Sequence, residues 1–549
     1  MPLQKNQVLT LQVERLSSDG SGVAHSPEGE TVFIPGAAPG DEARVRIVKD
    51  CKRYAFGILD EVLKPSPDRI PVDCAVAGPC GGCSLRHLDY AAELRAKQEN
   101  VADAFARIGG LDVPVLPIVG SPEIDRYRNK VQFPVGTDKA GRPCIGFYAG
   151  RTHRIVPCPD CRLQPGVLNE IGNTLCAFFA EKGIHPYNEE TGKGLVRHIF
   201  LRRGAHSGQI MVCLVSTRAK LPSAEELCTR LKEAFPDIVT ILLNVNAKNT
   251  NVILGSETHT LYGQGYIEDT LCGVPVQLGP LSFYQVNTLA AEQLYGIAAE
   301  YAQLTPDDLL LDLYCGMGTI GLSMADHCRE LVGVEIVPEA IESAKANAAR
   351  MGAAVSAKSR FFCADAGQAA AQLAAEGLHP DVVMLDPPRK GCDGATLSAV
   401  VRMAPRRVVY VSCNPATAAR DAAWLEQNGY HAEKVQPVDL FPRTKHVETV
   451  CLLSKLNVKH HIEVEITMDE LDLTAAESKA TYDEIKAYVL EKFGFKVSQL
   501  YIAQIKRKCG IIERKNYNQS KKEDAKVPKC PPEKEAAIMD ALKHFQMIP

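Results

Sequence analysis

Apolar and polar positions are most regularly arranged between residues 290 and 454, where short apolar runs are separated by stretches of helical periodicity. Helices of about 10 to 15 residues are expected between the first five runs, which predicts a doubly wound sheet. In such a sheet, ligands bind at the carboxyl ends of the strands. The predicted strands are residues 309–313, 331–335, 360–364, 382–385, 407–412, 432–437 and 447–453.

Residues 7 to about 65 show a shorter period, in which Leu9, Leu11 and Val13 alternate with polar neighbours. Gly and Pro separate this segment from strand candidates at 31–34 and 43–48, so a small β-barrel is predicted. One barrel face either holds RNA by charge and stacking or is an ordinary solvated surface. The residues of that face are Arg44, Arg46, Lys49, Lys52, Arg53, Tyr54 and Phe56.

Between these regions, residues 74–92 are loop-like and rich in cysteine, and residues 93–108 have the pattern of a helix. Mixed strands and helices follow from 124 to 270. Within them, strands are expected at 197–203 and 210–215, and a helix at 223–234.

The last part of the chain predicts a strand at 462–466, a helix opened by a capping box at 474–477, and a final helix at 532–545. None of these carries recognisable chemistry, so we interpret the segment as a peripheral module for gripping substrate or for interaction. The whole pattern predicts domains at residues 1–65, 66–270, 271–454 and 455–549.

The composition is that of a globular chain, since 46% of the 549 residues are hydrophobic and 23% are charged. A net charge of -4 argues against nucleic-acid binding over the whole surface but permits a local basic face. The N-terminal sequence lacks a signal-peptide core, and no apolar run approaches the roughly 18 residues of a membrane helix. We therefore expect a cytoplasmic protein without membrane contact, in which an odd number of cysteines, 19, argues against a disulfide framework.

A glycine-rich turn at residues 312–319 joins a predicted strand to a helix and lets the backbone approach a ligand. Glu335 ends the next strand about twenty residues later, where a carboxylate can hold ribose hydroxyls. The turn lacks the full G-x-G-x-x-G spacing, so NAD is disfavoured. Asp365 is placed to meet an adenine amine. Asp386 ends the fourth strand, where it either belongs to the site or serves as a turn residue.

Cys413 follows the fifth strand, and the Asn-Pro turn after it holds the thiol at the sheet edge. A thiolate that adds to C6 of a uracil makes C5 nucleophilic enough to accept a methyl group from a sulfonium. A base must then remove the C5 proton, and Glu448 is placed to do so. Taken alone, Cys413 could be a buried structural cysteine and Glu448 a surface carboxylate. Their placement after a cofactor turn favours the catalytic interpretation, in which the donor's charge lowers the thiol pKa.

Two further segments carry possible chemistry. Residues 280–287 contain aromatic and amide side chains that could stack on a flipped base, or they could simply lead into a helix. Cys74, Cys80 and Cys83 have metal-ligand spacing, and Cys158 or Cys161 could supply a fourth thiolate. Four thiolates suit zinc or an iron–sulfur cluster equally well, and reduced loop cysteines remain the alternative.

Together these segments resemble the RNA uracil-C5 methyltransferase family, and most closely its bacterial 23S ribosomal RNA branch. The resemblance covers roughly residues 5 to 454. The matching motifs are Phe283–Asn287 (F-x-Q-V-N), Asp312–Gly318 (D-x-Y-C-G-x-G), Asp386–Arg389 (D-P-P-R), Ser412–Pro415 (S-C-N-P) and His446–Glu448 (H-V-E). Arg443 departs from the pattern, because relatives often have histidine there, and it is expected to alter contacts to RNA.

The resemblance implies a multidomain α/β protein. It would join an OB-like TRAM barrel, a central α/β domain with an iron–sulfur loop, a Rossmann-like class I methyltransferase domain with seven strands, and an α-rich appendix. S-adenosylmethionine would contact Gln285, Tyr314, Glu335 and Asp386. Cys413 would be the nucleophile and Glu448 the proton acceptor, and a [4Fe-4S] cluster would be held by Cys74, Cys80, Cys83 and Cys161. Cys161 is preferred to Cys158 because the residues after it better match the family.

The predicted function is therefore methylation of uridine C5 in 23S ribosomal RNA by a monomeric enzyme. A methyltransferase for the T-loop uridine of transfer RNA is the nearest alternative. The cysteine group and the barrel favour ribosomal RNA, because the common bacterial transfer-RNA branch usually lacks both. An RNA-binding protein that has kept the fold without turnover is the alternative from another class.

Overall fold

The structure, a computed structural model, describes residues 3–150, 152–456, 482–509, 530–545 and 547–548. The chain divides into two compact units, Met1–Asn457 and Val458–Pro549, and each is described by itself. No helix in the described ranges is long and apolar enough to cross a membrane.

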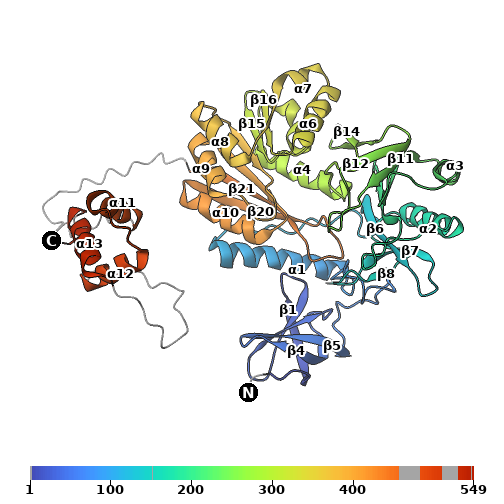
Figure 1. Ribbon diagram of the computed structural model, residues 1–549, viewed down its shortest axis with the longest axis horizontal. Coiled ribbons are helices and arrows are strands. Elements are labelled where there is room, and N and C mark those ends of the chain that lie inside the picture. Colours follow the sequence, from blue (N-terminus) through green and yellow to red (C-terminus); the bar gives the residue numbers. More distant parts are fainter. Residues whose placement is uncertain (1–2, 151, 457–481, 510–529, 546, 549) are drawn as a thin grey trace. The chain divides into compact units, whose positions relative to one another are not determined.

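The first unit begins with a closed five-stranded barrel in the order β1-β2-β3-β5-β4 (Figure 1). Alternate side chains such as Leu11, Val13, Val45 and Ile47 fill its interior, as the period-two pattern predicted. Gly57 is required on the inner face, because a Cβ there would lie 2.3 Å from Val45 Cγ1. The strands are Val8–Leu16 (β1), Ser21–His25 (β2), Thr31–Pro35 (β3), Glu42–Asp50 (β4) and Tyr54–Lys64 (β5).

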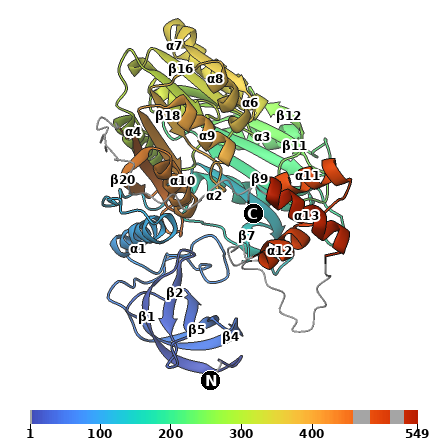
Figure 2. The ribbon, with the colours of Figure 1, turned by 90° about the vertical axis from the view of Figure 1, so that its left-hand side faces the viewer.

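A long helix follows the cysteine-rich loop and lies between the barrel and the last sheet of the unit in both ribbon views (Figures 1 and 2). This helix, α1 (Tyr90–Asp103), starts where Asp89 accepts a hydrogen bond from the backbone N–H of Ala92. It continues into a short π-helix at Ala104–Gly109 that packs on α10 (Pro415–Gln427). The helix predicted at 93–108 is thus present, but its last turn is wider than an α-helix.

The central part of the unit is a seven-stranded sheet in the order β12-β11-β10-β9-β6-β7-β8. Its core is formed with helices α2 (Gly166–Glu181) and α3 (Ala224–Ala234). A separate hairpin of β13 (Ile267–Leu271) and β14 (Val274–Leu278) follows. The sheet strands are Lys130–Thr137 (β6), Pro143–Tyr148 (β7), Ile155–Pro157 (β8), Val196–Arg203 (β9), Ile210–Ser216 (β10), Ile238–Val245 (β11) and Glu257–Tyr262 (β12).

The second seven-stranded sheet has the order β17-β16-β15-β18-β19-β21-β20. Six strands run in the same direction, and β21 runs antiparallel between β19 and β20. All seven predicted strands are present, and each observed end lies within two residues of the predicted end. They are Leu309–Leu313 (β15), Glu330–Glu335 (β16), Ser359–Cys363 (β17), Val382–Leu385 (β18), Arg407–Ser412 (β19), Tyr430–Val438 (β20) and Glu448–Lys455 (β21).

Helices cover both faces of this sheet, with separate apolar cores on the two sides. The prediction of long helices after each strand is wrong in one place, because α5 (Thr319–Ser323) has only five residues. The other helices are Thr288–Ala302 (α4), Pro338–Arg350 (α6), Ala353–Lys358 (α7), Ala366–Ala375 (α8), Gly394–Met403 (α9) and α10. The chain leaves β15 for β16 on one side and returns to β18 on the other, so a crevice opens at their carboxyl ends.

The described part of the second unit is helical, with α11 (Tyr482–Phe493), α12 (Gln499–Lys508) and α13 (Pro532–His544). Ile485, Val489, Ile502 and Ile538 are among the side chains that form its own apolar core. The final helix was predicted at nearly these bounds. The strand predicted at 462–466 and the capping box at 474–477 lie outside the described residues.

Candidate active site

The glycine-rich turn leaves β15 at Leu313 and enters α5 at Thr319. Tyr314, Gly316 and Gly318 all have positive φ, at 66°, 54° and 79°. A Cβ on Gly316 would meet nothing within 4 Å, so the turn faces open space at this residue. The geometry suits a ligand that lies directly against the backbone.

Glu335, at the end of β16, lies beside this turn. Its Oε2 accepts a hydrogen bond from the Gly316 N–H at 3.1 Å, and its Oε1 accepts one from the Val337 N–H at 2.9 Å. Each carboxylate oxygen keeps a second lone pair for another donor. Ile336 and Val337, which follow, are 61% and 46% exposed and form an apolar surface next to the carboxylate. The sequence analysis overlooked these two residues, although apolar side chains directly after a strand-end carboxylate were a visible signal.

Asp386 ends the neighbouring strand β18, and burial raises the pKa of its carboxyl to about 7. Asp312, at the fourth position of β15, is deeper. Its Oδ2 accepts a hydrogen bond from the Gly321 N–H at 3.0 Å, and burial raises its pKa to about 8, with the charges of Asp386 and Glu335 adding to the shift. Buried carboxyls this close together are less costly when a cation lies among them.

Asp365 is the N-cap of helix α8. Its Oδ1 accepts hydrogen bonds from the backbone N–H groups of Gly367 and Gln368, both at 3.1 Å. One carboxylate oxygen is thus engaged at the helix N-terminus, and the contact of Asp365 with an adenine amine stays a prediction.

The thiol and the carboxylate proposed for catalysis lie on adjacent antiparallel strands. Cys413 directly follows β19, Glu448 begins β21, and the two strands pair with Ser412 opposite Thr449. Because the strands run in opposite directions, the end of one meets the start of the other at the same edge of the sheet. The structure thus brings together two residues that are 35 positions apart in the sequence.

Glu448 is almost completely buried, and burial raises its pKa well above the ordinary value, with the charge of Asp386 adding to the effect. Burial also raises the pKa of the Cys413 thiol, followed by the charge of Glu448, while Arg389 acts in the opposite direction by charge and hydrogen bonding. Both groups are therefore held toward their neutral forms in the absence of ligand. A positive charge placed among them would favour ionisation of both.

Several hydrogen bonds fix the turn that follows Cys413. The Asn414 side chain caps α10 by accepting from the Ala416 N–H at 3.2 Å, and its Nδ2 donates to the carbonyl of Arg389 at 3.0 Å. Ser412 Oγ accepts from the Asn414 N–H at 3.1 Å. The Asn-Pro turn thus holds both the thiol and the loop that carries Asp386 and Arg389.

Asp421 is a positioning residue that the sequence analysis missed. It is buried on α10, and its Oδ2 accepts hydrogen bonds from the Cys392 N–H at 2.8 Å and the Tyr410 hydroxyl at 2.5 Å. Its Oδ1 accepts from Arg420 Nε at 2.8 Å. A carboxylate among alanines on the apolar face of the helix was the available signal.

The segment from Phe283 to Asn287 was expected either to stack on a flipped base or to lead into a helix, and it has features of both. Asn287 is the N-cap of α4, which supports the structural interpretation, and Asn129 holds the Gln285 carbonyl at 2.8 Å. The Gln285 side chain hydrogen-bonds to the hydroxyl of Tyr295, while Phe283 is 70% exposed. Only part of this segment is therefore available to a substrate.

Arg443 contacts protein groups in a buried network. Its Nη1 donates to the carbonyl of Leu88 at 3.0 Å, its backbone N–H donates to Glu93 Oε1 at 2.7 Å, and its carbonyl accepts from the Ser84 N–H at 3.0 Å. Lys97 lies in the same network, with Nζ 2.7 Å from Glu93 and 2.8 Å from Asp439. The side chain thus joins the cysteine-rich loop to the segment that precedes Glu448.

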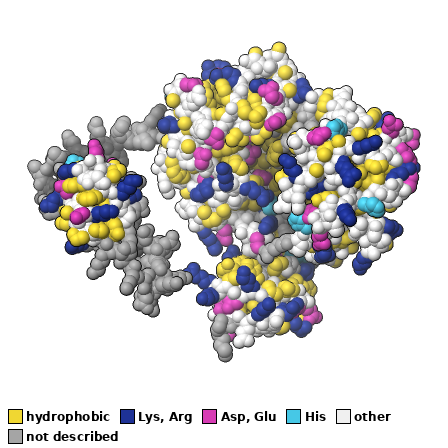
Figure 3. Space-filling model, in the orientation of Figure 1, with side chains coloured by type: hydrophobic (Ala, Val, Ile, Leu, Met, Phe, Trp, Pro, Cys, Tyr) yellow, Lys and Arg dark blue, Asp and Glu magenta, His cyan; other side chains and the backbone are white. Residues whose placement is uncertain are grey.

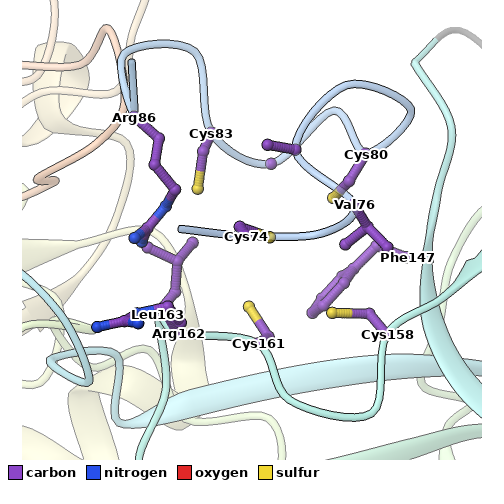
Figure 4. A pocket seen from close by; sticks show the side chains of 12 residues that line it. Cys74, Val76, Cys80, Cys83, Arg86, Phe147, Cys158, Cys161, Arg162 and Leu163 are labelled. Atoms are coloured by element: carbon purple, nitrogen blue, oxygen red, sulfur yellow. The ribbon is translucent and has the colours of Figure 1, made fainter. Parts of the chain in front are cut away.

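The cysteine-rich loop and residues 157–163 enclose a small cavity of about 50 Å³ (Figure 4). Five cysteines line it together with Arg86, which forms ion pairs with Asp73 at 2.9 Å and Asp125 at 2.7 Å. No group of three or more His, Cys, Asp or Glu side chains in the described parts of the chain is arranged to hold a metal ion. The lining cysteines are Cys74, Cys80, Cys83, Cys158 and Cys161.

The two candidates for a fourth ligand differ in their surroundings. In Figure 4 the Cys161 sulfur points toward Cys74, whereas the Cys158 sulfur lies beside the Phe147 ring. Cys158 is only 3% exposed, and its interaction with Cys161 lowers the pKa of Cys161. Burial raises the pKa of Cys83 to about 11, and Arg86 acts against this shift.

The barrel face considered for RNA binding divides into two parts. Arg44 and Arg46 pair with Glu61 and Asp60 at 2.6 and 2.8 Å, so their charges are compensated. Phe33, Tyr54 and Phe56 instead form an aromatic group with ring centroids 5.7 to 5.8 Å apart. Tyr54 is 41% exposed.

Comparison with known proteins agrees with this architecture. Residues 243–456 match the family described as tRNA (Uracil-5-)-methyltransferase, and residues 2–59 match the TRAM domain. An uncharacterized RNA methyltransferase of Halalkalibacterium halodurans is 43% identical over 83% of this chain and 99% of its own length. A second, from Oceanobacillus iheyensis, is 42% identical over 82% and 98%.

Among solved structures, a Pyrococcus abyssi tRNA (uracil-54, C5)-methyltransferase in complex with S-adenosyl-L-homocysteine superposes with a TM-score of 0.65. It is 28% identical and covers 81% of this chain and all of its own. The doubly wound sheet and its glycine turn are those of an S-adenosylmethionine-dependent class I methyltransferase. More specifically, the chain belongs to the RNA uracil-C5 methyltransferase family and carries an N-terminal TRAM domain.

Proposed function

We propose that the protein methylates C5 of a uridine in 23S ribosomal RNA, with Cys413 as nucleophile and Glu448 as proton acceptor. The observation that carries this proposal is the pairing of β19 with β21, which sets a thiol and a buried carboxylate side by side at the sheet edge. The acidic crevice formed by Asp386 and Glu335 opens at the same edge.

S-adenosylmethionine, when bound, supplies the electrophilic methyl group. We assign its contacts to Gln285, Tyr314, Glu335 and Asp386. The residues fit this ligand, because the open turn at Gly316 admits a close ligand and Glu335 retains acceptor capacity for hydroxyls. The raised pKa of Asp386 describes a carboxyl that gains from a nearby positive charge.

In the proposed reaction, the Cys413 thiolate adds to C6 of the uracil and pushes electron density onto C5, which then takes the methyl group. Glu448 removes the proton from C5, and the electron pair left behind expels the Cys413 thiolate from C6. The products are 5-methyluridine, the demethylated donor and one proton. Arg389, which hydrogen-bonds to Cys413, stabilises the thiolate before addition and after elimination.

RNA containing 5-fluorouridine tests the assignment directly, because fluorine at C5 cannot be removed as a proton. With the methyl donor present, the wild-type protein is expected to form a covalent adduct that survives denaturing electrophoresis. Cys413→Ala should form none. Equal trapping by that variant would move the nucleophile elsewhere.

Glu448→Gln provides the matched test of the base. This variant should add Cys413 and transfer the methyl group to ordinary uridine RNA, and then retain the methylated adduct because C5 keeps its proton. Slowing by about 10²- to 10⁴-fold is typical for loss of a general base. Normal release of methylated RNA would point to another proton acceptor.

Transfer RNA is the second candidate substrate. The Pyrococcus abyssi enzyme, whose title names tRNA uracil-54, matches 81% of this chain, which argues against treating the overall domain set as a mark of ribosomal RNA. Mapping 5-methyluridine in both RNA classes from a deletion strain decides between them. Loss from 23S ribosomal RNA supports the proposal, and loss from the T-loop supports the alternative.

We also propose that Cys74, Cys80, Cys83 and Cys161 bind a [4Fe-4S] cluster. Their side chains line one cavity, yet they do not close around a single ion, and a four-iron cluster is larger than one zinc ion. Arg86 would offset the negative charge of four thiolates. Iron and acid-labile sulfide analysis of anaerobically purified protein tests this assignment, and zinc at one equivalent would overturn it.

A further inference from the structure

A second hollow, outside the crevice described above, opens between the start of α9 and the middle of α10. Its volume is about 320 Å³, and its lining includes Lys390, Leu397, Arg420 and Trp424. This volume is at the lower end of the range for small-ligand sites, so it suits one nucleotide. In Figure 3, Lys and Arg side chains stand among hydrophobic ones on the face that carries α9 and α10.

The hollow is connected to the active site by a continuous loop. Asp386 and Arg389 lie in the crevice, and Lys390 and Gly391, which follow directly, line the hollow. Gly391 has a φ of 79°, and a Cβ there would lie 2.5 Å from Arg420 Nη2 and 2.6 Å from Asp421 Oδ2. A side chain at this position would displace the ion pair that forms one wall.

Buried contacts hold the cationic wall in place. Asp421, 1% exposed, accepts from Arg420 Nε, and Arg420 Nη2 donates to the Lys390 carbonyl at 3.0 Å. Arg420 Nη1 has no protein partner within the described ranges, and Lys390 is exposed. Asp393 also lines the hollow, but its Oδ1 accepts from the Thr396 N–H at 2.8 Å.

The formal charges around the hollow balance, so bulk attraction does not define its ligand. Its lining instead includes one indole ring, two cationic side chains and the apolar side chain of Leu397. An aromatic face with nearby cations is the arrangement that binds a stacked base and its phosphate.

We propose that this hollow is a subsite for one nucleotide of the substrate RNA, close in sequence to the target uridine, with its base on Trp424 and its phosphate at Lys390 and Arg420. This inference rests on the proposed function. Nine residues of α10 separate Pro415 from Trp424, a distance of about 14 Å that a few nucleotides of single strand can span. Enzymes that extrude a base commonly hold its neighbours in this way.

Trp424 is the only tryptophan in the chain, so tryptophan fluorescence, excited at a wavelength that tyrosine does not absorb, reports on this hollow. Titration of the full-length protein with an oligouridylate is expected to change the emission in a saturable way. Uridine monophosphate serves as the second probe, because a free nucleotide has the same chemistry as one residue of RNA. A response to the mononucleotide without any effect of the variants below on RNA would make the hollow a free-nucleotide site and overturn the proposal.

Steady-state methylation of an unmodified 23S transcript tests the same site by substitution. Trp424→Leu should raise KM for RNA about tenfold with little change in kcat, because one base–aromatic stack is lost. Trp424→Phe should restore most of the affinity, which a merely structural role for the indole would not explain. Lys390→Gln should weaken binding and reduce the salt dependence by about one phosphate contact.

The outcomes separate this inference from the proposed function. If both Trp424 variants and Lys390→Gln bind RNA and turn over as wild type does, the subsite is refuted while the methyl transfer stands. If no variant, nor the wild type, forms the 5-fluorouridine adduct, the proposed function itself fails. If Trp424→Leu does not fold, Trp424→Phe and Lys390→Gln still test the subsite, because neither removes a large part of the core.

Discussion

Two groups of thiols in this protein lie in opposite electrostatic surroundings. Burial raises the pKa of both Cys413 and Cys83. The next influence differs, because Glu448 raises the pKa of Cys413 further, whereas Arg86 lowers that of Cys83. Cys413 lies between a carboxylate, Glu448, and a cation, Arg389, so a further positive charge would favour its ionisation. Cys83 lies beside Arg86, whose hydrogen bond and charge act against the effect of burial.

The two environments bear on the two roles proposed for these thiols, a transient nucleophile and a metal ligand. A transient nucleophile benefits from a raised pKa at rest, since a neutral thiol resists oxidation and premature reaction. A metal ligand needs the reverse. The charges next to the sulfur, more than its depth of burial, distinguish Cys413 from Cys83.

The largest expected effect comes from removing one thiol of each kind. Cys413→Ala should reduce single-turnover methyl transfer by at least about 10³-fold, because no other group can add to the pyrimidine. Its thermal unfolding midpoint should stay close to that of wild type. Methylation assays with labelled donor, combined with calorimetry, provide both measurements.

Cys83→Ala is the matched control. This variant should lose iron and thermal stability while any RNA it methylates still passes through a Cys413 adduct. If Cys83→Ala abolished the adduct while retaining its iron, the division between the two thiol groups would be wrong.

The second prediction concerns Arg443, whose side chain joins the cysteine-rich loop to the segment that precedes Glu448. Arg443→Ala removes the hydrogen bond to the Leu88 carbonyl and the 3.8 Å ion pair with Glu93 Oε2, while the backbone hydrogen bond to Glu93 stays, at a cost of about 2 kcal/mol in the free energy of unfolding. Denaturant titration measures this loss. We also expect a lower kcat, because the segment before Glu448 loses its tie to the cysteine-rich loop.

Arg443→Lys separates charge from geometry, since lysine keeps the charge but cannot reproduce the planar fork of donors. It should fall between wild type and Arg443→Ala in stability. Indistinguishable stability of all three proteins would show that the two regions are not coupled through this side chain.

The third prediction uses the raised pKa of Glu448. Between the ordinary carboxyl pKa of 4.5 and the raised value, the folded ligand-free protein binds more protons at Glu448 than the unfolded chain does. Stability therefore falls as pH rises through this window. Glu448→Gln cannot ionise, so it should raise the unfolding midpoint by roughly 2–4 °C at pH 8, the size of a 1 kcal/mol effect.

At pH 4.5 the same substitution should have a smaller effect, because the wild-type carboxyl is already largely protonated in the fold. Calorimetry at both pH values without the methyl donor makes the measurement. A gain that is equal at the two pH values would contradict a buried, charge-sensitive carboxyl beside Cys413.

The smallest effect is expected on the barrel. Tyr54→Ala removes the exposed ring of the aromatic group and should weaken RNA binding by about 1 kcal/mol, at the low end for a stacked base. Arg46→Gln should change affinity less, since Arg46 is already paired with Asp60. Filter binding at two salt concentrations distinguishes them, and a larger loss for Arg46→Gln would reverse the assignment.

Much of this architecture follows from local patterns in the sequence. The strands 309–313, 382–385 and 407–412 were predicted at their observed bounds, because buried parallel strands are continuous apolar runs with sharp ends. The short length of helix α5 was not predicted; the helix ends at Ser323, and a turn of 3-10 helix at Ala325–His327 follows. Cys413 and Glu448, the proposed catalytic pair, were predicted as two separate strand-end residues, and their adjacency depends on the antiparallel register of β19 and β21.

Contacts between distant segments could not be predicted in the same way. Nothing near Arg443 in the sequence indicates that its partners are Leu88 and Glu93, some 350 residues earlier. The expectation that Arg443 alters RNA contacts came from its departure from the family's histidine, and that departure gave no sign of these internal partners. Likewise, the pairing of Arg44 and Arg46 with carboxylates on β5 required knowledge of how β4 and β5 align.

The antiparallel insertion of β21 has a consequence for how such enzymes can diversify. Hydrogen-bond register between two strands, and not the length of chain between Cys413 and Glu448, sets the spacing of the reacting groups. The loops between the two residues could therefore vary in length without pulling the pair apart, as long as the first turn of α10 and the pairing of β20 with β21 are kept. Evolution is free to rewrite the intervening surface for new RNA targets while the chemistry stays in place.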